Sequence, residues 1–274
     1  MEMANANEAN GAATQATIFP KISYYTDENG DGETLKVDCV HLTSSVTTWD
    51  QEWYFANGGT INGDVTIPAE ETVNIIIYDG TTLTINGTLK IAGNGSESAN
   101  LKIYGTSQAG TGKMVVTNLN SSQNNGNAIM SENEKTAYIH LIGGELTATG
   151  SGYNAEEGTG AALSNVRLLS EVNETIHRTA EVKCIVTGSD PEQKVEDTQT
   201  ETSVTISRCE CAEKDWKYEQ GENNTHRGYC NLCGYVENWD NGKNGYVGCS
   251  FGGGASVSAG EAGHYCTCYC GRRA

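Results

Sequence analysis

The chain has 274 residues, of which 33 are Gly, 30 are Thr and 25 are Asn, whereas only 3 are Pro and 3 are Phe. Because Gly, Thr and Asn favour turns and strands over helices, this composition argues against an α-helical bundle. Asp and Glu outnumber Lys and Arg by 35 to 17, and the formal charge of −18 disfavours nucleic acid and anionic membrane surfaces as partners.

The first segment, 1–18, is polar and rich in Ala and Asn, and it contains neither a basic region nor an apolar core. It therefore does not have the pattern of a signal peptide, and we expect a disordered tail. A run of 18 apolar residues is found nowhere in the sequence, so no membrane-inserted segment is predicted.

The next segment, 19–48, alternates weakly between apolar and polar residues around a polar turn at 27–32, which predicts a β-hairpin. The turn also fits a calcium-loop formula, in which the ligand positions are Asp27, Asn29, Asp31 and Asp38, with Gly32 between them. Calcium loops normally lead into an amphipathic helix, whereas 39–43 has the pattern of a strand. We therefore favour a plain turn and keep Ca²⁺ binding as the alternative.

Residues 49–170 contain short apolar runs, four of which end in Gly, at 61–63, 85–87, 103–105 and 142–144. Their spacings are 24, 18 and 39 residues, and the last is close to two steps of about 20. Short strands at such a period predict a solenoid, in which each strand pairs with its equivalents in the neighbouring coils. The alternative is an antiparallel sandwich, which would show longer alternating strands and hairpin turns.

The runs expected to form strands in this region are short and rich in β-branched residues: 65–67, 75–77, 83–85, 89–91, 101–103, 114–116 and 146–148. Two further strands are expected at 182–186 and 203–207, with a polar, acidic loop at 188–202 between them. After Arg208 the pattern stops, and eight of the ten cysteines follow. The sequence therefore predicts a β-domain at 19–208 and a separate cysteine-rich module at 209–274.

The cysteine-rich module contains two similar signatures in which a His precedes closely spaced cysteines. The stretch Cys-x-x-Cys-Gly at 230–234 has the spacing of a zinc knuckle, because its turn directs two thiolates at one ion. The first predicted ligand set is Cys209 or Cys211 with His226, Cys230 and Cys233. The second set has a less typical spacing and consists of Cys249, His264 and two of Cys266, Cys268 and Cys270.

Disulfides are the competing interpretation, because a secreted chain with an even number of cysteines would normally oxidise them. We favour structural Zn²⁺. In either case the role of the cysteines is structural, since 66 residues with few large apolar side chains need a metal ion or disulfides to stay folded. No open coordination position is implied. Cys39 and Cys184 stand apart from the module, and they either pair across the core or remain buried thiols.

Several stretches together resemble a family of large repetitive surface proteins from gut Firmicutes. The resemblance is carried by 25–30, 47–54, 65–67, 79–84, 101–105, 110–113 and the tail signature His-x-x-x-Cys-x-x-Cys-Gly at 226–234. It implies a right-handed parallel β-helix that follows a Trp-Tyr opening, and an extracellular setting, at the cell surface or secreted. The tail departs from the family pattern, because Cys211 stands where a His is more usual and Cys268 is extra.

The favoured function is that of an extracellular, non-catalytic adhesion module that binds a glycan or another cell-surface ligand. A rigid solenoid flank can display aromatic side chains that stack on sugar rings. The aromatic candidates are Trp49, Trp53, Tyr54, Tyr78 and Tyr104. Packing in the core or at the end of a coil is the alternative role for these side chains.

An enzyme on the same scaffold, a polysaccharide lyase or a glycoside hydrolase, is one alternative function. Such an enzyme needs carboxylates at a set separation, whereas the available ones show no repeated offset: Asp64, Glu70, Glu71, Asp79 and Glu145. Three lysines are expected at similar places on successive coils, where they would line one face: Lys90, Lys102 and Lys113. We lean against an enzyme and name no catalytic residue. A purely structural stalk is the other alternative.

Overall fold

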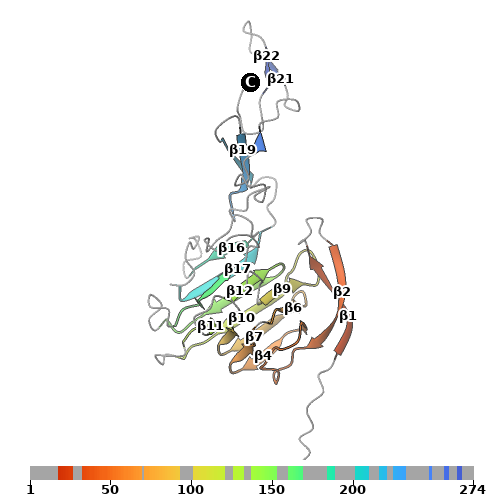
Figure 1. Cartoon of the computed structure of the whole chain (residues 1–274), viewed down its shortest axis with the longest axis vertical. Coiled ribbons are helices and arrows are strands. Elements are labelled where there is room, and N and C mark those ends of the chain that lie inside the picture. The colour runs from red at the N-terminus through yellow and green to blue at the C-terminus, as the bar shows by residue number, and fades with distance from the viewer. Residues whose placement is uncertain are drawn as a thin grey trace, which may run out of the picture.

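The computed structural model describes residues 18–26, 33–69, 71–92, 101–120, 126–132, 137–152, 160–168, 184–188, 201–209, 216–220, 225–232, 247–248, 256–258 and 264–266. Within these ranges the secondary structure consists of strands, numbered β1 to β22 (Figure 1). The described residues contain no helix long and apolar enough to cross a membrane. The predicted all-β class is confirmed. The expected tail at 1–18, except for Ile18 at the start of β1, the polar turn at 27–32 and most of the loop at 188–202 lie outside the described residues.

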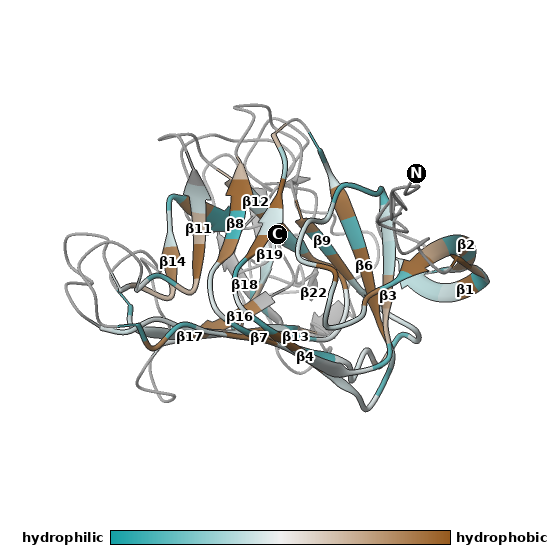
Figure 2. Ribbon diagram, turned by 90° about the horizontal axis from the view of Figure 1, so that it is seen from below, coloured by the Kyte–Doolittle hydropathy of each residue, from teal (hydrophilic) through white to brown (hydrophobic). Residues whose placement is uncertain are grey.

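Three parallel sheets form the centre of the molecule, and the chain passes through them in turn (Figures 1 and 2). The first sheet contains β3 (Trp53–Ala56), β6 (Val73–Ile77), β9 (Leu101–Gly105), β12 (Ala137–Leu141) and β15 (Val166–Leu168). The second contains β4 (Gly59–Asn62), β7 (Thr82–Asn86), β10 (Lys113–Thr117) and β13 (Glu145–Thr149). The third contains β5 (Val65–Ile67), β8 (Leu89–Ala92), β11 (Ile129–Glu132) and β14 (Leu163–Ser164). We call one pass through the three sheets a coil.

Apolar side chains of successive coils stack on one another in the interior. Ile61 of β4 pairs with Ile85 of β7, which pairs in turn with Val116 of β10, and all three are buried. Their neighbours in the strands point to the opposite face, as the two-residue period of a strand requires, so Thr60 is exposed and Thr84 is half-buried. Short β-branched triplets therefore suffice to build the core, because each strand buries one face against the interior and pairs along both edges.

The coils are unequal and longer than the predicted step. Asn62 and Asn86 occupy equivalent positions 24 residues apart, whereas Lys113 and Glu145 are equivalent at a separation of 32. The largest spacing seen in the sequence is a single coil, because Ile103 pairs directly with Leu141. The assumed period of about 20 is therefore wrong. Segments between strands, such as 93–100 between β8 and β9, lengthen individual coils.

The same error misplaced the three lysines. Lys90 lies in β8 of the third sheet, Lys102 in β9 of the first sheet and Lys113 in β10 of the second sheet. They therefore lie on three different sheets, and the expectation that they line one face is wrong.

Antiparallel strands flank the parallel strands at both ends. At the start, β1 (Ile18–Thr26) and β2 (Glu33–His41) form the predicted hairpin, and β2 pairs in parallel with β3. At the other end, β17 (Ser203–Arg208) pairs antiparallel with β13, and β16 (Cys184–Thr187) pairs antiparallel with β17. We call β16 and β17 the capping pair.

The described strands after Arg208 form small antiparallel sheets instead of continuing the coils. One contains β18 (Trp216–Gln220), β19 (Thr225–Cys230) and β20 (Val247–Gly248). The other contains β21 (Ser256–Ser258) and β22 (His264–Cys266). The parallel pairing therefore ends before the cysteine-rich part of the sequence begins.

Candidate functional site

The hairpin β1–β2 packs over the outward face of the first sheet. Tyr24 of β1 lies with its ring centroid 4.8 Å from that of Trp53 in β3 and 5.0 Å from that of Tyr104 in β9. The rings of Trp53 and Tyr104 are 5.4 Å apart. We call these three residues the aromatic cluster. Because the outward side chains of this sheet are large and apolar, the hairpin shields them from water, as it does for Phe55 and Ile76.

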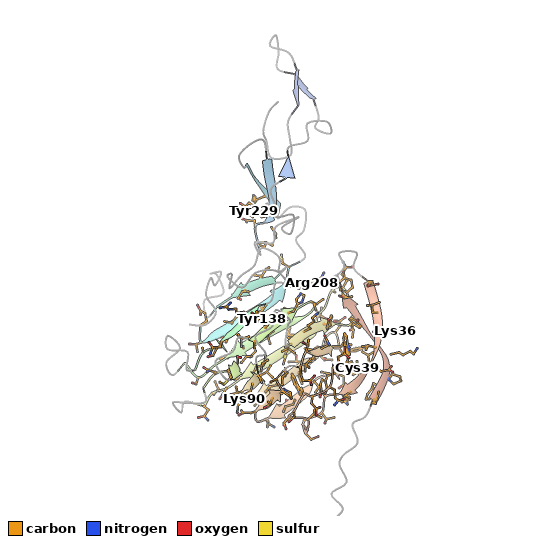
Figure 3. All side chains as sticks on the ribbon, viewed as in Figure 1. Lys36, Cys39, Lys90, Tyr138, Arg208 and Tyr229 are labelled. Atoms are coloured by element: carbon orange, nitrogen blue, oxygen red, sulfur yellow. The ribbon has the colours of Figure 1, made fainter. Side chains whose placement is uncertain are left out.

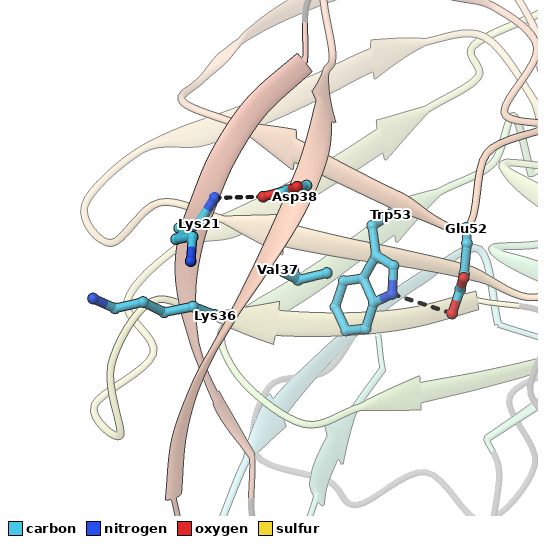
Figure 4. Close-up of a pocket in the computed structure, with 6 residues that line it drawn as sticks. All are labelled: Lys21, Lys36, Val37, Asp38, Glu52 and Trp53. Atoms are coloured by element: carbon cyan, nitrogen blue, oxygen red, sulfur yellow. Dashed lines mark hydrogen bonds between the residues drawn. The ribbon is translucent and has the colours of Figure 1, made fainter.

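A cleft of about 550 Å³ opens beside the aromatic cluster, between the hairpin and the start of β3 (Figure 4). The hairpin provides one side of the cleft, and β3 with the residue before it provides the other. The lining residues are Lys21, Lys36, Val37, Asp38, Glu52 and Trp53. The cleft therefore combines one indole ring with hydrogen-bonding side chains of both charges.

A bulge in β1 shapes the hairpin side of the cleft. The pairing of β1 with β2 shifts register between Phe19 and Ile22, and Lys21 adopts a φ of 56°. A residue with a Cβ in this left-handed region costs about 1–2 kcal/mol. The backbone N–H of Lys21 donates to Oδ1 of Asp38 at 2.9 Å, which gives this N–H a partner at the bulge.

The indole of Trp53 is held in place on the other side of the cleft. Its Nε1–H donates to Oε1 of Glu52 at 3.2 Å, as Figure 4 shows. The Glu52 backbone carbonyl in turn accepts from Nδ2 of Asn74 at 3.0 Å, and Oδ1 of Asn74 accepts from the Tyr104 hydroxyl at 3.4 Å. Ring contacts and hydrogen bonds thus fix the orientation of the half-buried Trp53 ring without any ligand.

The other aromatic candidates occupy different environments. Trp49, Tyr54 and Tyr104 are buried, so they pack inside the protein instead of presenting a ring to solvent. The Tyr54 hydroxyl accepts the backbone N–H groups of Asp50 and Gln51 at 3.0 and 3.1 Å, and burial raises its pKa. Tyr78, after β6, is 53% exposed. Among the five, only Trp53 lines the cleft.

Of the four described carboxylates that the sequence offered for catalysis, Glu71 is exposed and the other three make contacts between coils. Oδ2 of Asp64 lies 2.8 Å from Nζ of Lys90, and Oε1 of Glu145 lies 3.0 Å from Nζ of Lys113. Asp79 accepts hydrogen bonds from the Ser107 hydroxyl and from the Thr111 backbone N–H. These contacts hold neighbouring coils together. Glu70 lies outside the described residues.

Two of the predicted metal ligands lie side by side. Sγ of Cys209 and Sγ of Cys230 are 3.7 Å apart, and both side chains are buried. Cys209 directly follows β17, whereas Cys230 is the last residue of β19. The two thiols therefore meet at the junction between the capping pair and the first C-terminal sheet.

The remaining predicted ligands do not join this pair in the described part of the chain. His226 lies four residues before Cys230 in the same extended strand, and at about 3.3 Å per residue their backbones are about 13 Å apart. Five others lie outside the described residues: Cys211, Cys233, Cys249, Cys268 and Cys270. His264 and Cys266 are in β22. Within the described residues no group of three or more His, Cys, Asp or Glu side chains is arranged to hold a metal ion.

The two cysteines outside the module also occupy different elements. Cys39, in β2, is a buried free thiol beneath the hairpin. Cys184 begins β16 at the other end of the parallel stack.

Sequence reasoning singled out Trp53 but missed the other residues that line the cleft. Lys21 and Lys36 belong to no motif, Asp38 was considered only as a ligand of the alternative calcium loop, and Glu52 only as part of the 47–54 stretch; the four meet because the hairpin folds over the first sheet. The Trp-Tyr pair at 53–54 was the one local signal. Comparisons of the chain with protein-family models, with curated proteins and with solved structures give no match.

Proposed function

We propose that this chain is an extracellular, non-catalytic adhesion module that binds a glycan in the cleft beside Trp53. The observation that carries the proposal is the fixed indole of Trp53 at the wall of a cleft of about 550 Å³. A cleft of this volume is within the range of small-ligand sites in proteins, which is about 300–1,000 Å³.

The chemistry of the lining suits a sugar better than a purely apolar ligand. The face of a pyranose ring is apolar and packs on an aromatic ring, whereas its hydroxyl groups need donors and acceptors around the rim. Lys21 and Lys36 are donors, and Asp38 and Glu52 are acceptors. Because the ring of Trp53 is already held by Tyr24 and Glu52, less side-chain entropy is lost when a ligand binds.

The architecture of the parallel sheets also supports the proposed extracellular role. We propose that the three parallel sheets form a right-handed parallel β-helix, as the resemblance to surface proteins of gut Firmicutes implies, and that the chain acts at the cell surface or after secretion. Strands that stack coil upon coil make a rigid support, since each coil is hydrogen-bonded to its neighbours. We favour binding over hydrolysis because Asp64 and Glu145 each pair with a lysine of another coil.

The test begins with a broad glycan array probed with the full chain. Captured glycans are then titrated by calorimetry against Trp53→Ala, which removes the stacking surface. We expect at least a tenfold loss of affinity, corresponding to about 1.4 kcal/mol, and a smaller loss for Trp53→Phe. Tyr78→Ala is the matched control, because Tyr78 is an exposed aromatic residue outside the cleft.

Two results would contradict the proposal. Absence of capture across the array would favour a structural stalk over a binder. Equal affinity of the wild type and Trp53→Ala, with unchanged circular dichroism, would exclude this cleft as the binding site. Release of products from captured polysaccharides would instead indicate an enzyme.

A further inference from the structure

The contact between Cys209 and Cys230 joins two parts of the fold that share no backbone pairing in the described residues. Cys209 continues from β17, which pairs with β13 and β16, whereas Cys230 ends β19, which pairs with β18 and β20. The thiol pair therefore bridges the parallel stack and the first C-terminal sheet.

Arg208, the residue before Cys209, is held in place by two contacts. Its Nη1 donates to the carbonyl of Ile142 at 3.1 Å, and its guanidinium lies 4.9 Å from the ring centroid of Tyr25. Figure 3 shows Arg208 at the end of the parallel stack that faces the C-terminal strands, below the labelled Tyr229. The bond and the cation–π contact together anchor the end of β17 to the first sheet and to the hairpin.

The separation of the two sulfur atoms fits shared coordination of one metal ion. Two thiolates bound to one tetrahedral Zn²⁺ at about 2.3 Å lie about 3.7–3.8 Å apart, whereas a disulfide holds its sulfur atoms at about 2.05 Å. The observed distance is 3.7 Å, and both thiols are buried. Cys230 also opens the Cys-x-x-Cys-Gly stretch, which is typical of zinc ligands.

We infer that Cys209 and Cys230 are thiolate ligands of one structural Zn²⁺ that fastens the capping pair to the C-terminal sheet. Zn²⁺ displaces the two thiol protons into solvent, so no oxidant is needed. Two further ligands complete a tetrahedral site. His226 is not one of them, because β19 holds it about 13 Å from Cys230. The metal thus acts between the two parts of the molecule, rather than only within the cysteine-rich module.

A zinc ion bound by Cys209 would also restrain the neighbouring strand β17. Because the ion restrains the end of that strand in addition to Arg208 and the pairing with β13 and β16, its removal is expected to loosen β17 as well as β19. Hydrogen exchange of the β17 amides, including the buried Val204 and Ile206, therefore reports on the metal even though these residues contact no ligand.

The experiment uses the full chain purified under reducing conditions, with zinc counted by native mass spectrometry. Cys209→Ser and Cys230→Ser are each expected to bind one zinc fewer than the wild type. Cys39→Ser and His226→Ala are the matched controls, and both are expected to keep the wild-type zinc content. A chelator is expected to speed hydrogen exchange in 203–208 and 225–230 of the wild type, with little change in β7.

Co²⁺ replacement in the wild-type chain gives a readout that does not depend on how the variants fold. A thiolate-to-cobalt charge-transfer band is expected in the wild type, and its absence would overturn the inference. The inference is overturned if the wild type carries no zinc and its mass shows Cys209 and Cys230 joined as a disulfide. It is also overturned if Cys209→Ser retains all of the zinc, or if His226→Ala loses it.

Discussion

Cys39 illustrates how the hairpin sets the chemistry of a single side chain. The thiol is buried between the hairpin and the first sheet, and this burial, with the negative charge of Asp38 beside it, raises its pKa to about 12. Alkylating reagents attack the thiolate, which is almost absent at pH 8 when the pKa is that high. Cys39 is therefore expected to stay unmodified by iodoacetamide in the native protein and to react in guanidinium chloride. Peptide mass mapping after each treatment checks this, and rapid native modification would contradict it.

Asp64 makes a small contribution to the free energy of unfolding, and this contribution depends on pH. Burial alone would raise its pKa, but the hydrogen bonds from the Lys90 ammonium and the Thr88 backbone N–H outweigh that effect, so the pKa lies below the ordinary value of 3.8. A lowered pKa in the folded state means that the stabilisation is complete above about 3.8 and is lost as the pH falls through the folded-state pKa.

Asp64→Asn is accordingly expected to lower the free energy of unfolding at pH 7, by no more than about 1 kcal/mol because the pair is partly exposed. The difference from the wild type should shrink as the pH falls below 3.8, as urea denaturation at several pH values would show. Lys90→Met removes the other partner and should give a loss of similar size at pH 7. A difference that grows in acid would contradict the assignment.

Substitutions in β17, a strand of the capping pair, test how much its pairing with both neighbouring strands stabilises the end of the parallel stack. Thr205 pairs with Thr147 of β13 on one side and with Thr187 of β16 on the other, so β17 is an internal strand of its sheet. Proline there removes a backbone donor and fits poorly between two partners. Thr205→Pro is expected to lower the free energy of unfolding by about 2 kcal/mol or more.

Thr205→Val is the control for this strand, because it keeps the backbone N–H and the β-branched shape. It removes only the hydroxyl that lies 3.3 Å from the Thr147 hydroxyl, and we expect a change below about 0.5 kcal/mol. Urea denaturation of the three proteins measures both effects. Equal losses for the two variants would show that the ladder around Thr205 contributes little.

The strands themselves were the most predictable elements. Each apolar triplet, such as 83–85 or 114–116, lies in a strand, because its apolar residues bury one face against the interior. Coil length was not predictable, since it depends on segments such as 93–100 whose size follows no repeat. Without the correct length, the strands of different sheets could not be told apart, which is why Lys90, Lys102 and Lys113 were assigned to one face.

The candidate site depends on contacts between segments that are far apart in the sequence, and no local pattern encodes such contacts. Tyr24 and Tyr104 belong to strands far apart in the chain, and no periodic signal links a terminal hairpin to the outward face of the first sheet. The cysteine spacing predicted metal ligands that include both Cys209 and Cys230. It could not show that Cys209 lies beside Cys230, because that proximity depends on where β17 ends against the rest of the fold.

The described edge strands at the end of the parallel stack are short, and this limits the addition of strands from a second molecule. A stack of parallel strands presents, at its last coil, the same backbone groups that accepted every earlier coil, and a second molecule could add there as it does in a fibre. In the part of the chain that the structure describes, the three sheets finish on β14, β15 and β16, with 2, 3 and 4 residues. Within the described residues, edges this short template a further strand poorly, so they disfavour the addition of a second molecule at this end of the stack.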